Sequence, residues 1–303
     1  MPTVGVSLSD THIRIVTLQK RSGNFVLSNY ASKELPQGAL EAGYVHKPKE
    51  IVEILKQLKK EFGLKFVEAT LPEEKAFVYQ TNVPKGTHAE MRNAVEISIE
   101  ENVPIIADEA VFDFAPLPHD EQTAETVRVI VTVVPLKVVE TYLDLFTQAG
   151  LFVTAFELES QAIARAIVPQ DDTNTYLVIN CERFKTGFYV AAGNSIRFTS
   201  TITATTADIT QISTEIDKIY WHLHSEHKGG KRGKIFRIIL VGEGAMNDGV
   251  REHIFSTVGI GVELGNVWQN VFTFDNYVPD IPLKESLPYA AAVGLALRIT
   301  NHD

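Results

Sequence analysis

The sequence has little cysteine, no long apolar run and a deficit of positive charge. Its single cysteine, Cys181, has no partner for an internal disulfide, and no charged-then-apolar leader precedes the first strand at Val4, which together predict a reducing cytoplasm. The apolar stretch 127–136 is about half as long as a membrane-spanning helix and is rich in β-branched residues. The sequence contains 28 Lys and Arg residues and 38 Asp and Glu residues. A formal charge of -10 argues against nucleic acid as a partner.

The length and the order of the predicted elements indicate two lobes. A chain of 303 residues exceeds the size at which a single core stops growing. The first half opens with strands in 4–18 and 23–35, and after the polar linker 169–175 the second half opens again with a strand, turn, strand, turn and strand over 176–202. Two halves that each begin in this way suggest an ancient duplication.

Helical periodicity marks several further elements. In 47–63, apolar residues recur at helical spacing and Gly63 marks the end. Helices are also predicted at 87–104 and 208–227, the second leading into an exposed loop at 228–234. A small-residue helix at 287–298 closes the sequence. From Ala76 to Gly150 the pattern is strand, helix, two strands and helix, which predicts a compact α+β module inside a larger framework.

Five motifs stand out at 4–18, 82–114, 149–168, 214–224 and 287–298. Together and in this order they resemble the actin-like ATPases and, more narrowly, the type IV pilus assembly protein family PilM, which is related to the cell-division protein FtsA. The last, "LPYAAAVGLALR", is the most specific. The resemblance implies an α/β, actin-like (ribonuclease H-like) fold of two lobes, with a small α+β subdomain inserted in the first.

The resemblance also implies where the domains lie. The first actin-like domain would cover 1–168, with the inserted subdomain at about 82–148. The second domain, with a shortened outer subdomain, would cover 174–285. The C-terminal helix in 286–303 would return to the first domain.

The chain departs from the family at the nucleotide-binding positions. Ser7 and Ser9 replace an Asp and a Gly in the first hairpin, and Asn180 and Glu182 replace the corresponding pair in the second. Two carboxylates that would hold Mg²⁺ are lost, and Glu243 in the glycine turn adds negative charge near a phosphate. The resemblance thus implies a degenerate nucleotide site with no catalytic residue and no metal ligand. Its candidate nucleotide contacts are Ser7, Ser9, Thr11, Asn180, Thr186, Gly242, Gly244 and Ala245.

A structural interpretation of the same residues stays open. Ser7, Ser9 and Thr11 can cap a hairpin turn without any anion, and the glycines after residue 241 can serve the turn alone. The only cofactor that the resemblance implies is ATP with Mg²⁺, held weakly.

The function that the resemblance implies is that of a cytoplasmic scaffold rather than an enzyme. Such proteins bind the N-terminal cytoplasmic tail of PilN, a bitopic inner-membrane protein, and so lie at the membrane without inserting into it. Pilus motor ATPases are further candidate partners. The groove is expected between the first domain and its inserted module, near 66–84 and 127–150, with strand edges offered by 65–72 or 126–135. The alternatives are a working actin-like ATPase and a type II secretion scaffold domain of the same fold.

Overall fold

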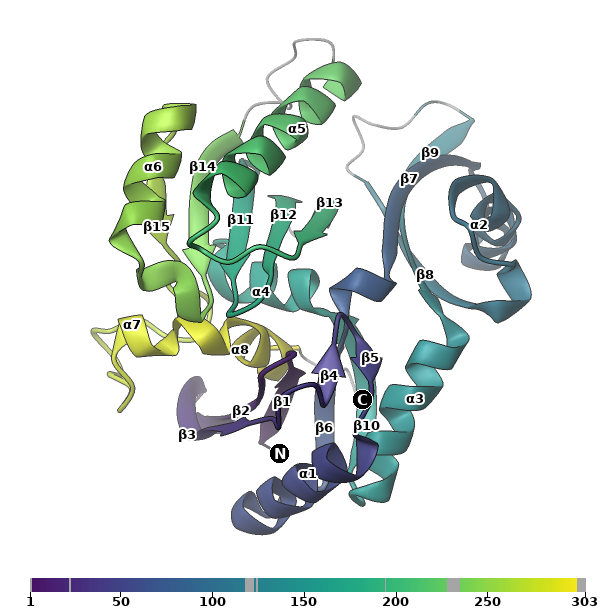
Figure 1. Cartoon of the computed structure of the whole chain (residues 1–303). Helices are drawn as coiled ribbons and strands as arrows, with labels where there is room; N and C mark the ends of the chain where they lie inside the picture. Colours follow the sequence, from purple (N-terminus) through teal and green to yellow (C-terminus); the bar gives the residue numbers. More distant parts are fainter. Residues whose placement is uncertain are drawn as a thin grey trace.

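The computed structural model describes residues 2–21, 23–117, 123, 125–193, 195–227 and 235–298, so the loop predicted at 228–234 lies outside the described residues. Within them the strands form two five-stranded sheets, a three-stranded sheet and a two-stranded ribbon of β4 (Leu40–Glu41) and β5 (Tyr44–Val45). Figure 1 shows the two larger sheets in separate lobes, with helices α4 (Glu159–Ile167) and α8 (Ala290–Ala296) between them. The two-lobed α/β prediction is confirmed.

The first lobe is built on a mixed sheet. Its strand order is β10 (Phe152–Leu158), β6 (Phe66–Leu71), β1 (Thr3–Leu8), β2 (His12–Arg21) and β3 (Asn24–Glu34). The first three strands of the chain are antiparallel, whereas β6 and β10 run parallel to β1. Apolar residues of α1 (Pro48–Phe62) and α3 (Leu136–Gln148) pack with Val4, Val6 and Leu8 in one buried core.

The helix predicted at 47–63 is α1, and its ends follow from local chemistry. Pro48 lies at the first helical position, where its missing N–H costs no hydrogen bond. Gly63 ends the helix at φ 64°, a left-handed conformation that glycine adopts without strain, and its N–H donates to Lys59 O. Ile51, Leu55 and Leu58 form the buried face.

The inserted module is a three-stranded antiparallel sheet in the order β7 (Phe77–Pro84), β9 (Thr126–Pro135) and β8 (Ala110–Pro116). Helix α2 (His88–Asn102) covers one face and is followed by the short 3-10 helix η2 (Ala107–Glu109). A capping box starts α2, because the Thr87 hydroxyl accepts from Glu90 N while the Glu90 carboxylate accepts from Thr87 N. The predicted order of strand, helix, two strands and helix is confirmed.

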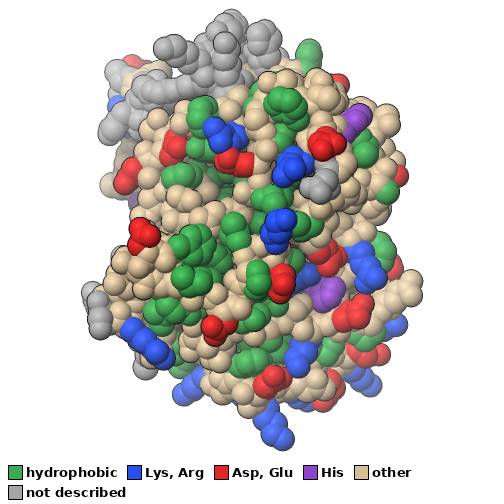
Figure 2. Space-filling view, turned by 90° about the vertical axis from the view of Figure 1, so that its left-hand side faces the viewer, with side chains coloured by type: hydrophobic (Ala, Val, Ile, Leu, Met, Phe, Trp, Pro, Cys, Tyr) green, Lys and Arg blue, Asp and Glu red, His purple; other side chains and the backbone are tan. Residues whose placement is uncertain are grey.

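The second lobe repeats the opening of the first. Its sheet has the order β13 (Ser195–Ile202), β12 (Thr186–Ala192), β11 (Thr175–Cys181), β14 (Ile235–Val241) and β15 (Val262–Leu264). All seven residues of β11 are buried. Helices α5 (Ile209–His227) and α6 (Asp248–Val258) flank this sheet, and α7 (Leu283–Ser286) with the 3-10 helix η6 (Leu287–Tyr289) leads into α8. Figure 2 shows acidic, basic and apolar side chains interspersed on one face of the molecule.

Helix α8 connects the end of the described chain to its beginning. Its seven residues are all buried. A Cβ added to Gly294 would overlap the Ala162 carbonyl of α4, and one added to Gly5 of β1 would overlap the Ala292 carbonyl. This close approach explains why the closing segment is rich in Ala and Gly. The domain boundaries near 168, 174 and 286 stay a prediction.

Candidate functional site

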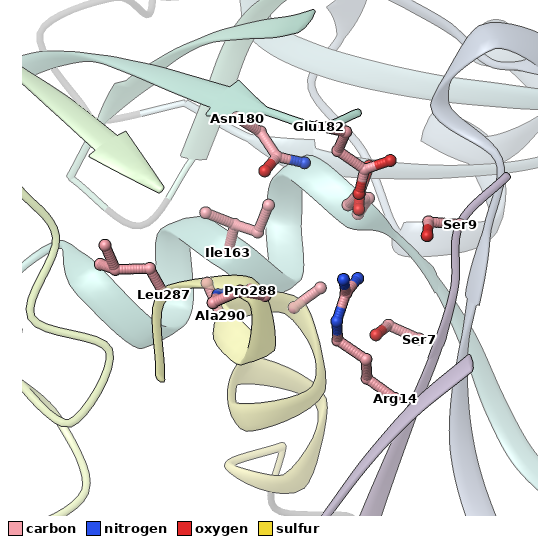
Figure 3. A pocket seen from close by; sticks show the side chains of 11 residues that line it. Ser7, Ser9, Arg14, Ile163, Asn180, Glu182, Leu287, Pro288 and Ala290 are labelled. Atoms are coloured by element: carbon pink, nitrogen blue, oxygen red, sulfur yellow. The ribbon is translucent and has the colours of Figure 1, made fainter. Parts of the chain in front are cut away.

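Three turns from different parts of the chain meet between the lobes. They are the β1–β2 turn at 9–11, the β11–β12 turn at 182–185, and Gly242 with the 3-10 helix η5 (Glu243–Met246) that follows β14. Beside them lies a cavity of about 10 Å³, the size of one water molecule. The residues that line it are Ser7, Ser9, Arg14, Glu159, Ile163, Asn180, Glu182, Leu287, Pro288, Ala290 and Ala291. Figure 3 shows nine of them labelled.

The structure brings some of the predicted nucleotide contacts together and not others. Ser7, Ser9 and Asn180 line the cavity, whereas Thr11 and Thr186 do not. Thr186 is fully buried and donates to Ala204 O at 2.8 Å. The Ser9 hydroxyl accepts from His12 N at 3.1 Å, so it closes its own turn. These bonds satisfy two of the predicted hydroxyls within the protein.

Gly242, Gly244 and Ala245 lie at the glycine turn but outside the cavity lining. Gly242 has φ 87°, and a Cβ there would come within 2.6 Å of Asn180 Oδ1. Its N–H donates to Leu287 O at 3.2 Å. Glycine is therefore required at this position by the turn and by close packing, whether or not a nucleotide is bound.

Arg14 is a cleft residue that the sequence interpretation missed. It is the register partner of Ser7 across the β1–β2 hairpin, so both side chains lie on the same face of the sheet. Its side chain is 7% exposed and its Nη2 lies 3.3 Å from Glu243 Oε2 in the second lobe. Figure 3 shows it pointing toward the turn that carries Glu182. His12 lies two residues before Arg14 in the same hairpin. Burial, followed by the charge of Arg14, lowers the pKa of His12.

A second cation, Lys185, lies among carboxylates in the same cleft. Its Nζ is 2.6 Å from Glu74 Oε1 in the first lobe and 4.0 Å from Glu182 Oε2 in its own turn. Burial opposes its charge, but the carboxylates of Glu182 and Glu74 raise the pKa of Lys185 well above its usual value. Burial, followed by the charge of Glu182, raises the pKa of Glu159. The cleft therefore holds several buried acids around one ammonium group.

Two of the residues that line the cavity are acidic, Glu159 and Glu182, and burial raises the pKa of both. Among the described residues, no group of three or more His, Cys, Asp or Glu side chains is arranged to hold a metal ion.

A larger cavity of about 330 Å³ lies between the first sheet and the inserted module. One wall is β8 and β9, and the other is formed by the ends of β6 and β10 with the start of α4, while Val139 of α3 also contributes. We call this cavity the groove. It is lined by Leu71, Val111, Phe112, Asp113, Phe114, Ala115, Ile130, Thr132, Val134, Val139, Phe156, Glu157, Leu158 and Gln161.

The strand edges at the groove differ from those predicted. Strand β6 lies between β10 and β1, and β9 lies between β7 and β8, so both predicted edges are central strands. The prediction that 65–72 or 126–135 offers a free edge is therefore wrong. The edge strands that line the groove are β8 and β10. Both strands are largely buried, as is usual for central strands.

The floor of the groove is mostly apolar with a polar centre. Cross-strand partners Val111 and Val134 lie at one end, and Ala115 and Ile130 lie at the other. Between them Asp113 is paired with Thr132, whose hydroxyl accepts from Gln161 Nε2 at 3.3 Å. The second lining carboxylate, Glu157, forms an ion pair with Arg165. Asp113 thus brings an exposed negative charge to the centre of the groove.

Comparison with known families identifies the chain. The family model of the type IV pilus assembly protein PilM matches residues 5–199, which include most of the first hairpin, the groove lining and most of β11 to β13. The chain belongs to the PilM family. Comparison with curated protein sequences gives no match.

Solved structures support the fold of this PilM-family chain. A PilM-PilN type IV pilus biogenesis complex contains a chain 22% identical over 97% of both chains, with a TM-score of 0.79. The ethanolamine utilization protein EutJ from Carboxydothermus hydrogenoformans is 15% identical, covering 98% of this chain and 89% of EutJ, with a TM-score of 0.55. The cytoplasmic domain of EpsL, an inner membrane component of the Vibrio cholerae type II secretion system, is 13% identical, covering 80% and 82%, with a TM-score of 0.50.

These likenesses confirm the predicted actin-like fold class, and the family-model match confirms the predicted family. Of the described helices, none combines the length and the apolar character that crossing a membrane requires.

Proposed function

We propose that this type IV pilus assembly protein is a scaffold that binds the N-terminal cytoplasmic tail of a PilN-like membrane protein in the groove. Its place would then be the cytoplasmic side of the inner membrane, where the bound tail holds it. The single observation that carries this proposal is the 330 Å³ groove bordered by two strand edges. The PilM-PilN complex supports the choice of partner.

The free edge of β8 suits an extended peptide. Five consecutive residues of this strand, Val111 to Ala115, line the groove, so its backbone as well as its side chains faces the cavity. An added strand gains main-chain hydrogen bonds from such an edge, and pockets for alternate side chains give specificity. The seven residues of β8 can pair with a strand of about six residues.

The lining indicates the composition of the bound tail. Apolar contacts at both ends of the floor favour a tail with alternating aliphatic residues. The Asp113 carboxylate between them favours Lys or Arg, and the formal charge of -10 would attract a basic tail over longer distances. Cytoplasmic segments next to a membrane span are often basic.

Peptide binding can be tested by isothermal titration with a synthetic peptide of the first residues of the PilN-like partner. Val139→Lys places a charge in the groove, and we expect it to weaken binding by at least about tenfold. Leu143→Lys is the matched control, because Leu143 lies one turn further along α3, is 42% exposed and is outside the groove lining. Equal loss in both variants, or no binding by the wild type, would contradict the proposal.

We further propose that the cleft has lost its nucleotide chemistry, so the protein is a pseudo-ATPase. Supporting this are the cavity of about 10 Å³ and the carboxylates that line it. Titration of the wild-type protein with Mg-ATP should give no heat at micromolar concentrations, and phosphate release should equal that of a buffer blank. Micromolar binding with measurable turnover would establish a working ATPase instead.

A further inference from the structure

One short turn lies between the groove and the interlobe cleft. The 3-10 helix η1 (Glu73–Lys75) follows β6, whose last residue, Leu71, lines the groove. Its two acidic residues make contacts with different parts of the molecule. Glu73 contacts the start of α4 and also Thr199 of β13, whereas Glu74 contacts Lys185 in the β11–β12 turn.

The Glu73 contact reaches the groove wall. Its carboxylate accepts from Ser160 N at 3.0 Å and from Ser160 Oγ at 2.9 Å, and all of these groups are buried. This anchors the first turn of α4, a favourable place for an acceptor. On either side of Ser160, Leu158 and Gln161 line the groove, while Glu159 lines the cleft cavity. The first turn of α4 therefore touches both sites.

The Glu74 contact joins the two lobes. Lys185 is the last residue of the β11–β12 turn in the second lobe. Its Nζ lies 2.6 Å from Glu74 Oε1. The two side chains are only 12% and 13% exposed. Oε2 of Glu74 is buried without a hydrogen-bond partner. The charge of this carboxylate is balanced by Lys185 through Oε1. Removing either partner in the closed structure would leave the other charge buried and uncompensated, which is strongly unfavourable.

We propose that η1 couples the groove to the closure of the lobes, with the Glu74–Lys185 ion pair as the closing contact. The proposal rests on the proposed function, because the occupant of the groove is the partner's tail. A tail packed on Leu71, Leu158 and Gln161 holds the end of β6 and the start of α4, which fix η1 between them. With η1 fixed, Glu74 stays opposite Lys185. Linkage requires the reverse effect, so opening the cleft weakens tail binding by the same factor.

Three further acidic groups contribute to the charge around Lys185. They are Asp10 of the first hairpin turn, Glu182 of the second turn and Glu159 of α4. Arg183 and Glu34 form another interlobe pair at 3.2 Å, but their side chains are 56% and 67% exposed. Because an exposed pair contributes little, Arg183→Met provides a matched control for loss of an interlobe ion pair.

The test combines affinity with hydrogen exchange on the full chain. The peptide of the PilN-like tail is titrated into wild type, Glu74→Gln, Lys185→Met and Arg183→Met. We expect about a fivefold or greater loss of affinity in the first two variants and less than about twofold in the control. In the wild type, the peptide should slow amide exchange at the start of β12, outside the groove, and Glu74→Gln should abolish that protection.

The outcomes separate the two proposals. If the wild type binds the peptide but exchange at β12 is unchanged and the three variants bind equally, the coupling is overturned while tail binding stands. If the wild type does not bind the peptide at all, the proposed function falls and the coupling with it. The exchange measurement on the wild type needs no variant, so a variant that fails to fold does not leave the coupling undecided.

Discussion

Replacing Glu73 by Gln should make the protein more stable above neutral pH and change its pH dependence. Glu73 is 4% exposed, and burial raises its pKa from 4.5 to about 7 despite the hydrogen bonds from Ser160. One pKa unit corresponds to about 1.4 kcal/mol, so ionising Glu73 costs about 3 kcal/mol more in the folded than in the unfolded protein. Gln keeps the shape and an acceptor oxygen but cannot ionise.

The direction follows from proton binding. As pH rises from 4.5 to about 7, the unfolded chain loses the Glu73 proton while the folded protein keeps it. The contribution of Glu73 to the free energy of unfolding is therefore fully present at low pH and is lost as pH rises through the pKa of the folded protein. The free energy of unfolding of Glu73→Gln minus that of the wild type should rise by about 3 kcal/mol between pH 4.5 and pH 8.

Urea titration followed by circular dichroism at a series of pH values measures this difference. Taking the difference between the variant and the wild type removes the contributions of those buried acids that do not interact with Glu73. Glu140→Gln, on the exposed side of α3, controls for the loss of a carboxylate as such. A difference that stays constant from pH 4.5 to 8, or that falls, would show that Glu73 does not ionise in the way its burial implies.

Three further predictions concern packing, reactivity and surface charge. Gly294→Ala should destabilise the protein by at least about 3 kcal/mol in urea titration, because its Cβ would overlap Ala162, whereas Gly261→Ala, with its nearest neighbour 4.0 Å away, should cost little. Cys181 is fully buried and burial raises its pKa to about 12, so it should react with a thiol reagent at least about 100-fold more slowly in buffer than in urea. Arg183→Met should change the free energy of unfolding by less than about 1 kcal/mol.

The elements that the sequence predicts well are those with strong local signals. The alternation in 4–18 gives β1 and β2, and the apolar periodicity with Gly63 gives α1 almost to the residue. The position of a strand within its sheet has no such local signal. The run that forms β9 reads as a strand, but whether it is central or at an edge depends on β7 and β8, which pair with it from separate parts of the chain.

The candidate site was only partly predictable for the same reason. Ser7 and Asn180 could be placed at the cleft because the family resemblance aligns each with a nucleotide-binding position of a hairpin. Arg14 could have been found from the hairpin register, which puts it beside Ser7. No local pattern joins Lys185 to Glu74, which is 111 residues away, or gives the depth of their burial. Such contacts depend on how two lobes close, and so they need the whole fold.

The packing of α8 has a consequence for the order of folding. β1 is synthesised well before α8, yet Gly5 of β1 lies against Ala292 of α8, and the Thr3 hydroxyl donates to Ala296 O. The face of β1 that α8 covers therefore stays uncovered until α8 has been synthesised. The core of the second lobe also includes Ala290, Val293 and Ala296 of α8, so it too is completed only when α8 has been made. The uncovered face of β1 is the surface that a chaperone would have to protect during synthesis.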